Sequence, residues 1–170
     1  FRSPGFRPDI EQLCAAQERG VQLTSEMEMF LANSPCPVIA ITGSDGKSTT
    51  TTLVANILRE SGHNCFLGGN IGEPLLNRID AMKEEDIIAV ELSSFQLMTM
   101  DSHAAHAAIT NITPNHLNWH IDMNEYAESK YNVCGDGTAR LVLNATDGYC
   151  RALAEKKDTD KILFSAYKES

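Results

Sequence analysis

The stretch Val38-Ile39-Ala40-Ile41-Thr42-Gly43-Ser44-Asp45-Gly46-Lys47-Ser48-Thr49 decides the fold of this chain. It opens with a continuous apolar run, which is typical of a strand buried on both faces of a parallel sheet. The residues from Lys47 onward have the periodicity of a helix, so a glycine-containing turn joins a buried strand to a helix. Backbone N–H groups in such a turn, together with the positive end of the helix, attract phosphate. The stretch therefore predicts an α/β fold with a phosphate-binding loop.

The turn also carries side chains that suit a nucleotide site. Lys47 is placed to reach the outer phosphates, and the Ser48 hydroxyl is placed to ligate Mg²⁺. The usual pattern of such loops, G-x-x-x-x-G-K-[ST], has a glycine where this chain has Ile41, so the loop is a variant. A glycine turn with a purely structural role would explain the glycines but not the order Gly-Lys-Ser-Thr. We expect nucleotide phosphates to contact Gly43, Ser44, Asp45, Gly46, Lys47, Ser48 and Thr49.

The rest of the chain alternates short apolar runs with helical patterns. Further strands are predicted at residues 21–23, 65–67, 87–92, 107–112, 140–144 and 161–165, and helices at 8–19, 26–31, 47–60, 74–82, 123–133 and 147–156. On the helix 47–60 the apolar face is expected to hold Leu53, Val54, Ile57 and Leu58. This order predicts a mostly parallel sheet wrapped by helices, with the ligand site at the carboxyl ends of the strands.

Composition narrows the classes of partner. The chain has 170 residues and a formal net charge of -9, so long-range attraction to nucleic acid or to an anionic membrane is not expected. The first residues have no apolar signal segment, and no apolar run is long enough to span a bilayer. The five scattered cysteines form no C-x-x-C pair and suit a reducing compartment. We expect a cytoplasmic protein.

Polar residues follow two of the predicted strands. Glu91 ends the strand 87–92, where a carboxylate is placed to hold Mg²⁺ beside the phosphate loop. His116 follows the strand 107–112 and falls on the same edge of the sheet, whereas His120, one helical turn later, is either a second metal ligand or a packing residue. Lys130 in the helix 123–133 reads as a solvated lysine on sequence alone. Ser93 and Ser94 lack the G-x-S-x-G elbow of a serine hydrolase.

Five motifs in order resemble the Mur ligases. They are residues 42–50, Gly68-Gly69-Asn70-Ile71-Gly72, Glu91-Leu92-Ser93-Ser94-Phe95-Gln96-Leu97, Asn111-Ile112-Thr113-Pro114-Asn115-His116-Leu117 and Tyr126-Ala127-Glu128-Ser129-Lys130. The second and third resemble the branch of the family that adds D-glutamate to UDP-N-acetylmuramoyl-L-alanine. The folylpolyglutamate synthetases share the phosphate loop but not the Ser-Ser-Phe-Gln segment.

The resemblance implies a domain plan, a reaction and a set of roles. Residues 1–35 correspond to the tail of the UDP-binding N-terminal domain and 36–170 to the central ATP-binding domain, with the amino-acid-binding C-terminal domain absent. The implied reaction is ATP-dependent amide synthesis through an acyl phosphate, in the making of peptidoglycan precursors. The implied ligands are ATP and one or two Mg²⁺ ions. The roles are Lys47, His116 and Lys130 in catalysis, Ser48, Glu91, His116 and a carbamylated Lys130 around the metal, and Asn70, Ser93 and Gln96 on the muramoyl substrate.

The chain departs from the family pattern near two of these roles. Asp45 stands where asparagine is usual, and a carboxylate beside phosphate is unfavourable unless it faces away or meets the metal. Asn115 and Asn118 stand where aspartates are usual, which predicts weaker metal binding near His116. Trp119 stands where arginine is usual.

Three alternatives stay open at this point. The chain could be an ATP- or phosphate-binding piece without activity of its own, because the amine-binding domain is not part of it. It could belong to another Mur-type or folylpolyglutamate-type ligase. A generic phosphate-loop ATPase or kinase would release or transfer phosphate without needing an amino acid.

Overall fold

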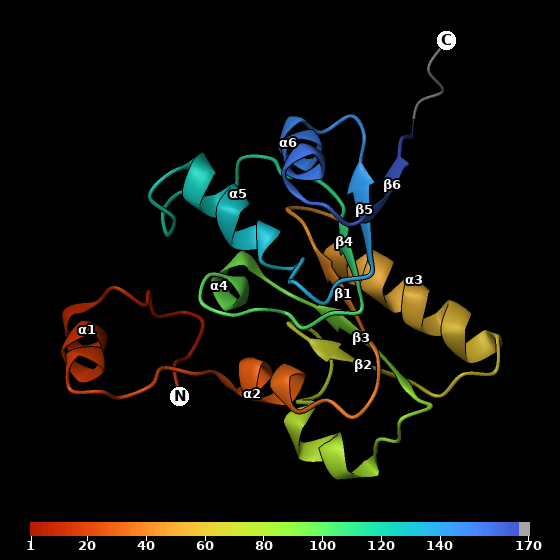
Figure 1. Cartoon of the computed structure of the whole chain (residues 1–170), viewed down its shortest axis with the longest axis horizontal. Coiled ribbons are helices and arrows are strands. Elements are labelled where there is room, and N and C mark those ends of the chain that lie inside the picture. Colours follow the sequence, from red (N-terminus) through yellow and green to blue (C-terminus); the bar gives the residue numbers. More distant parts are fainter. Residues whose placement is uncertain (167–170) are drawn as a thin grey trace.

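A six-stranded parallel sheet forms the centre of the molecule. The computed structural model describes residues 1–166, and its strands lie in the order β2-β3-β1-β4-β5-β6 (Figure 1). Every pair of neighbouring strands is parallel, as the sequence predicts. The strands are β1 (Val38–Thr42), β2 (Cys65–Gly69), β3 (Ile87–Glu91), β4 (His106–Ile109), β5 (Arg140–Asn144) and β6 (Asp160–Phe164).

Helices cover both faces of the sheet. In Figure 1, α3 lies on one side, and α4, α5 and α6 lie on the other. The short helix α2 packs against the 3-10 helix η1. The helices are α1 (Glu11–Glu18), α2 (Glu26–Ala32), α3 (Lys47–Glu60), η1 (Leu76–Ala81), α4 (Ser94–Leu97), α5 (Met123–Tyr131) and α6 (Gly148–Lys156). None of the helices in residues 1–166 is both long and apolar enough to cross a bilayer.

Alternate residues of the central strands feed two separate cores. Val38, Ala40, Ile88 and Val90 belong to the larger apolar cluster, on the face covered by α5 and α6. Ala89 points the other way and joins a small cluster under α3. β1 and β3 are buried on both faces, as the sequence predicts. This burial explains why their sequences are continuously apolar.

Five details of the sequence prediction differ from the structure. Residues 21–23 form no strand, and the strand predicted at 107–112 ends at Ile109. The pattern at 74–82 forms a 3-10 helix rather than an α-helix, and the short helix α4 was not predicted. On α3, Leu53 and Ile57 are 57% and 55% exposed. Only the other half of the expected face, Val54 and Leu58, packs against the core.

Candidate functional site

The loop between β1 and α3 has the backbone that its glycines predict. Gly43 has φ +148°, and a Cβ there would collide with Thr110 Oγ1. Gly46, at φ +77°, is the residue before α3 and adopts the left-handed conformation. Lys47 opens the helix, and its Nζ donates a hydrogen bond of 2.8 Å to the Ser44 carbonyl. The chain therefore curls back on itself just before the N-terminus of a 14-residue helix.

Three predicted residues meet at the first turn of α3. Ser48 Oγ donates to Glu91 Oε2 at 2.6 Å, and Asn70 Nδ2 donates to Glu91 Oε1 at 2.9 Å. Glu91 ends β3 and is 1% exposed, so its charge is shielded from water. Gly69 makes the approach possible, because a Cβ at its φ of +100° would collide with the Glu91 carbonyl oxygen. The ends of β2 and β3 thus deliver an amide and a carboxylate to the helix that carries Ser48.

Lys130 lies on α5 but points into the loop. It is 1% exposed, its Nζ donates to the Gly43 carbonyl at 2.8 Å, and it lies 4.5 Å from the centre of the Tyr126 ring. Burial, followed by the charge of Lys47, lowers the pKa of Lys130 to about 7, against the opposing pull of Glu91 and Asp45. The solvated surface lysine that the sequence alone favoured is therefore wrong. A large fraction of this amine is neutral near pH 7.

Ser44 and Asp45 hold the loop to the next segment of the sheet edge. Ser44 Oγ donates to the Thr113 carbonyl, accepts from the Thr113 N–H at 2.9 Å, and lies 2.9 Å from the Tyr126 hydroxyl. The Asp45 carbonyl accepts from Thr110 Oγ1 at 2.6 Å. The exposed Asp45 carboxylate accepts a hydrogen bond from Thr113 Oγ1 at 3.3 Å. Thr49, the last loop residue predicted, is exposed in the first turn of α3.

The two histidines of the predicted pair have different surroundings. His116 has a left-handed φ of +55°, and its ring centre lies 4.9 Å from that of Phe95. Burial, with the nearby charges of Lys130 and Lys47, lowers the pKa of His116, which favours the neutral form of the ring. His120 is 2% exposed, and its Nε2 lies 2.9 Å from Ser94 Oγ. His120 is thus a buried packing residue, whereas His116 lies toward the loop lysines.

Ser93 and Gln96 bind each other at the start of α4. Ser93 donates its N–H to Gln96 Oε1 at 2.9 Å and its hydroxyl to the same oxygen at 3.0 Å. Gln96 N–H donates back to Ser93 Oγ at 3.3 Å, which completes a capping box. Both residues therefore have a local structural role, two to five residues after Glu91.

The side chains at the loop suit Mg²⁺ better than a metal ion that is ligated by protein side chains alone. Within residues 1–166 no three His, Cys, Asp or Glu side chains come together as a metal cluster. Mg²⁺ is commonly held by one or two carboxylates, with substrate phosphates and water completing its shell. The pair Ser48 and Glu91, 2.6 Å apart at the phosphate loop, fits that requirement.

An apolar pocket adjoins the loop. Its volume is about 590 Å³, within the range of small-molecule sites. Asp45, Gly46 and Thr50 line it from the loop and the first turns of α3, and Ala108 and Val142 are among the strand residues that line it. The pocket could not be predicted from the sequence, because the sheet face that lines it comes from β4, β5 and β6 together. Tyr126 and Thr113 belong to sequence motifs, yet the motifs do not indicate their hydrogen bonds to Ser44.

Sequence comparisons agree with these observations. Residues 41–170 match the Mur ligase middle domain. The UDP-N-acetylmuramoylalanine--D-glutamate ligase of Acetivibrio thermocellus is 48% identical over 167 residues, which cover 97% of this chain and 36% of that relative. The ligase of the same name from Ruminiclostridium cellulolyticum is 47% identical, with the same coverage. The chain therefore spans little more than a third of the length of these relatives.

Solved structures match at the level of the fold. A UDP-N-acetylmuramoyl-L-alanyl-D-glutamate--2,6-diaminopimelate ligase superposes with a TM-score of 0.69 at 19% identity, over 81% of this chain and 33% of that one. A bifunctional folylpolyglutamate synthase/dihydrofolate synthase, solved with Mn, AMPPNP and L-glutamate, gives a TM-score of 0.56 at 18% identity, over 90% and 50% of the two chains. Because residues 41–170 match that middle domain and relatives of one name are 47–48% identical over 97% of its length, this chain belongs to the Mur ligase family.

Proposed function

We propose that this chain is the nucleotide-binding part of an ATP-dependent ligase that adds D-glutamate to UDP-N-acetylmuramoyl-L-alanine. The single observation that carries the proposal is the convergence of Lys47, Ser48, Glu91 and Lys130 on one loop. The names of relatives at 47–48% identity support the choice of substrates. In this proposal residues 1–35 are the tail of a UDP-binding domain and 36–170 the central domain, of which residues 167–170 lie outside the described structure.

The reaction proceeds in two steps. The carboxylate of the muramoyl substrate attacks the γ-phosphorus of ATP, the bond to the β,γ-bridging oxygen breaks, and ADP leaves. The amine of D-glutamate then attacks the acyl phosphate, an amide bond forms, and phosphate departs while the amine loses its proton. Lys47 and the N-terminus of α3 stabilise the negative charge that develops on the transferred phosphoryl group.

Mg²⁺, when bound, supplies positive charge that neutralises the phosphate oxygens. Ser48 and Glu91 would hold it, with His116 and a modified Lys130 in support. The lowered pKa of Lys130 suits that modification, because a neutral amine can attack CO₂. The neutral nitrogen would form an N–C bond as one C–O π bond of CO₂ opens to an oxyanion, and loss of an N–H proton would leave a carbamate anion in place of the ammonium form. The change converts a charge that opposes metal binding into one that favours it.

The muramoyl substrate would approach from the side of β2 and α4. Asn70 already contacts Glu91, and Ser93 and Gln96 lie at the beginning of α4. We assign these three residues to substrate contacts in addition to the hydrogen bonds that they make within the protein. The proposed setting is the cytoplasm, where peptidoglycan precursors are built for cell division and cell shape.

The pocket beside the loop would take the sugar and base of the nucleotide. A Val142→Trp variant should fill part of it, because Val142 lines the pocket on β5. We expect this variant to bind Mg·ATP more than about 10-fold more weakly, since a buried ligand ring loses its apolar contacts. Binding of inorganic triphosphate, measured by calorimetry, should change by less than about twofold. An equal loss for both ligands would contradict the placement.

Lys47→Ala tests the main proposal. In the full-length ligase that contains this sequence, the variant should lower phosphate release in the presence of ATP, the muramoyl substrate and D-glutamate by roughly 10³-fold. Lys156→Ala is the matched control, because Lys156 is an exposed lysine whose ion pair with Glu128 lies on the surface. Unchanged turnover in Lys47→Ala would remove the assignment. Circular dichroism should show that both variants keep the fold.

The second candidate is a nucleotide-binding piece without turnover. The observation that favours it is coverage, since the chain spans 36% of the length of its curated relatives. On this reading the 170-residue chain binds Mg·ATP but releases no phosphate with both substrates present. Release by the chain alone would decide against it.

A further inference from the structure

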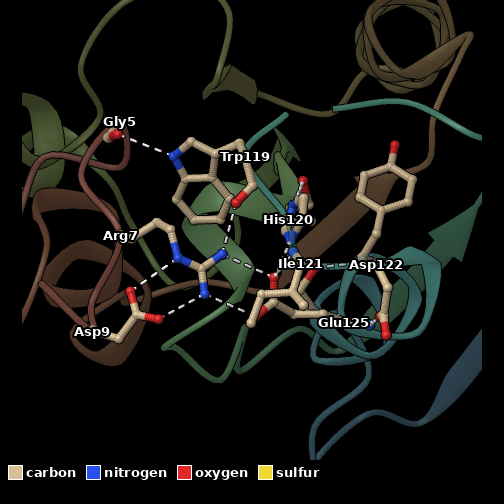
Figure 2. Close-up of polar contacts among 11 residues, drawn as sticks. Gly5, Arg7, Asp9, Trp119, His120, Ile121, Asp122 and Glu125 are labelled. Atoms are coloured by element: carbon tan, nitrogen blue, oxygen red, sulfur yellow. Dashed lines mark hydrogen bonds and ion pairs between the residues drawn. The ribbon is translucent and has the colours of Figure 1, made fainter. Parts of the chain in front are cut away.

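The first residues of the chain are anchored to the segment that follows His116. Arg7 Nη1 donates to the Trp119 carbonyl at 2.7 Å and to Glu125 Oε2 at 2.9 Å, and Arg7 Nη2 donates to Glu125 Oε1 at 2.9 Å (Figure 2). The opposite side of the guanidinium binds the exposed Asp9. Arg7 and Glu125 have side chains only 20% and 21% exposed, so this pair is better shielded than an ordinary surface ion pair.

Trp119 adds a second layer to the anchor. The Arg7 guanidinium carbon lies 5.1 Å from the centre of the indole ring, and Trp119 Nε1 donates to the Gly5 carbonyl at 3.1 Å. The other rings continue inward, because Phe95 lies 4.5 Å from Trp119 and 4.9 Å from His116, centre to centre. An unbroken path of contacts therefore runs from Arg7 to the His116 ring.

Glu125 fixes the same turn from its other end. Glu125 Oε2 accepts the Ile121 N–H at 2.8 Å and lies 3.3 Å from His120 Nδ1, without the alignment of a hydrogen bond. The N–H groups of Trp119 and His120 both donate to the His116 carbonyl, at 2.9 Å and 3.0 Å. One carboxylate and one guanidinium thus hold the turn that begins at the left-handed His116.

We propose that Arg7 is a positioning residue that sets the place of His116 beside the phosphate loop by clamping residues 116–121 through Trp119 and Glu125. The inference rests on the proposed function, in which His116 supports the bound Mg²⁺. It assigns to the N-terminal segment a part in metal binding, although that segment itself contributes no metal ligand. Partners that orient a metal ligand commonly change metal affinity 10- to 100-fold when removed.

Calorimetry on this chain distinguishes an effect of Arg7 on Mg²⁺ binding from an effect on nucleotide binding by the loop. The affinity for a non-hydrolysable ATP analogue is measured once with Mg²⁺ and once without it. The ratio of the two affinities is the Mg²⁺ gain. Arg7→Ala should lower this gain roughly 10-fold and leave the Mg²⁺-free affinity within about twofold, because the phosphate loop is untouched. Arg140→Ala is the matched control, since Arg140 forms an exposed ion pair with Asp160 at the far side of the sheet. It should behave as wild type.

Tryptophan fluorescence and a second variant make the test decisive even if Arg7→Ala does not fold. Trp119 is the only tryptophan, so its emission should shift to the red and its quenching by acrylamide should increase in Arg7→Ala but not in Arg140→Ala. Glu125→Gln keeps an acceptor for the Ile121 N–H but loses the carboxylate, and it should show the same loss of Mg²⁺ gain if Arg7→Ala does not fold. A folded variant with the full gain overturns the inference. A wild-type chain without any Mg²⁺ gain overturns the proposed function as well.

Discussion

Gly43 and Gly137 show how differently two glycines respond to a methyl group. Gly43→Ala would bring a Cβ into Thr110 Oγ1 at a φ of +148°, whereas a Cβ at Gly137 meets nothing within 4 Å. We expect Gly43→Ala to lower the free energy of unfolding by about 2–4 kcal/mol, because strain and collision add. Gly137→Ala should change it by less than about 0.5 kcal/mol. Urea denaturation of both variants measures the difference, and equal values would contradict the loop geometry.

Lys130 should give stability a distinctive dependence on pH. Its pKa is about 7 when folded and about 10.5 when exposed, so between these values the unfolded chain binds more protons. Stability therefore rises with pH across this window, by up to about 1.4 kcal/mol per pH unit, and below it the cost of the buried cation is fully present. Lys130→Met should lack this slope. Urea denaturation in CO₂-free buffer, inside and below the window, tests it; parallel curves would refute the lowered pKa.

Sequence reasoning predicted which residues lie together at the loop, but not what surrounds them. Lys47, Ser48 and Glu91 could be predicted because strand–loop–helix order places them at one sheet edge. The burial of Lys130 could not, since its helix carries Glu125 and Glu128 and has no local sign of contact with the loop. Arg7 lay outside every motif. Its guanidinium lies over the Trp119 ring, and only tertiary structure connects the two residues.

At the scale of the elements, the residues that cap α4, Ser93 and Gln96, are also the ones proposed to contact the substrate. Ser93→Ala removes the acceptor for the Gln96 N–H and should lower the free energy of unfolding by ~1 kcal/mol. Ser93→Thr keeps a capping hydroxyl and should lose less than half of that. The exposed Ser61, which follows α3, is a control, and Ser61→Ala should cost under about 0.5 kcal/mol. Thermal melts compare them, and an unaffected Ser93→Ala protein would mean that the box contributes no stability.

Helices and strands could be predicted from the apolar pattern of the sequence wherever the tertiary packing buries the residues that the pattern marks as apolar. The strand Val38–Thr42 and the helix Lys47–Glu60 were predicted with the bounds that the structure has. Residues 21–23 have strand-like composition but no neighbouring strand, so no ladder forms. The exposed half of the α3 face shows the same limit. Periodicity identifies apolar positions, whereas the strands that happen to lie beneath the helix decide which of them are buried.

Across the whole molecule, stability should fall from the centre of the sheet to β6. Leu143 on β5 is 0% exposed, and its neighbour in register, Leu163 on β6, is 54% exposed. Leu143→Ala should cost about 2–5 kcal/mol, because it leaves a buried cavity. Leu163→Ala should cost under about 1 kcal/mol, since little of that side chain is removed from water. Urea denaturation of this matched pair checks the gradient, and similar costs would mean that β6 is as well packed as β5.

The order β2-β3-β1-β4-β5-β6 also has a consequence for the chain as it is synthesised. Of the six strands described here β1 is made before the others, and its two neighbours are β3 and β4, of which β4 begins only at His106. A nascent chain that stops short of His106 therefore leaves one whole side of an apolar strand without hydrogen-bond partners. An open strand edge of this kind pairs readily with another copy, so the growing chain is exposed to aggregation until β4 has left the ribosome.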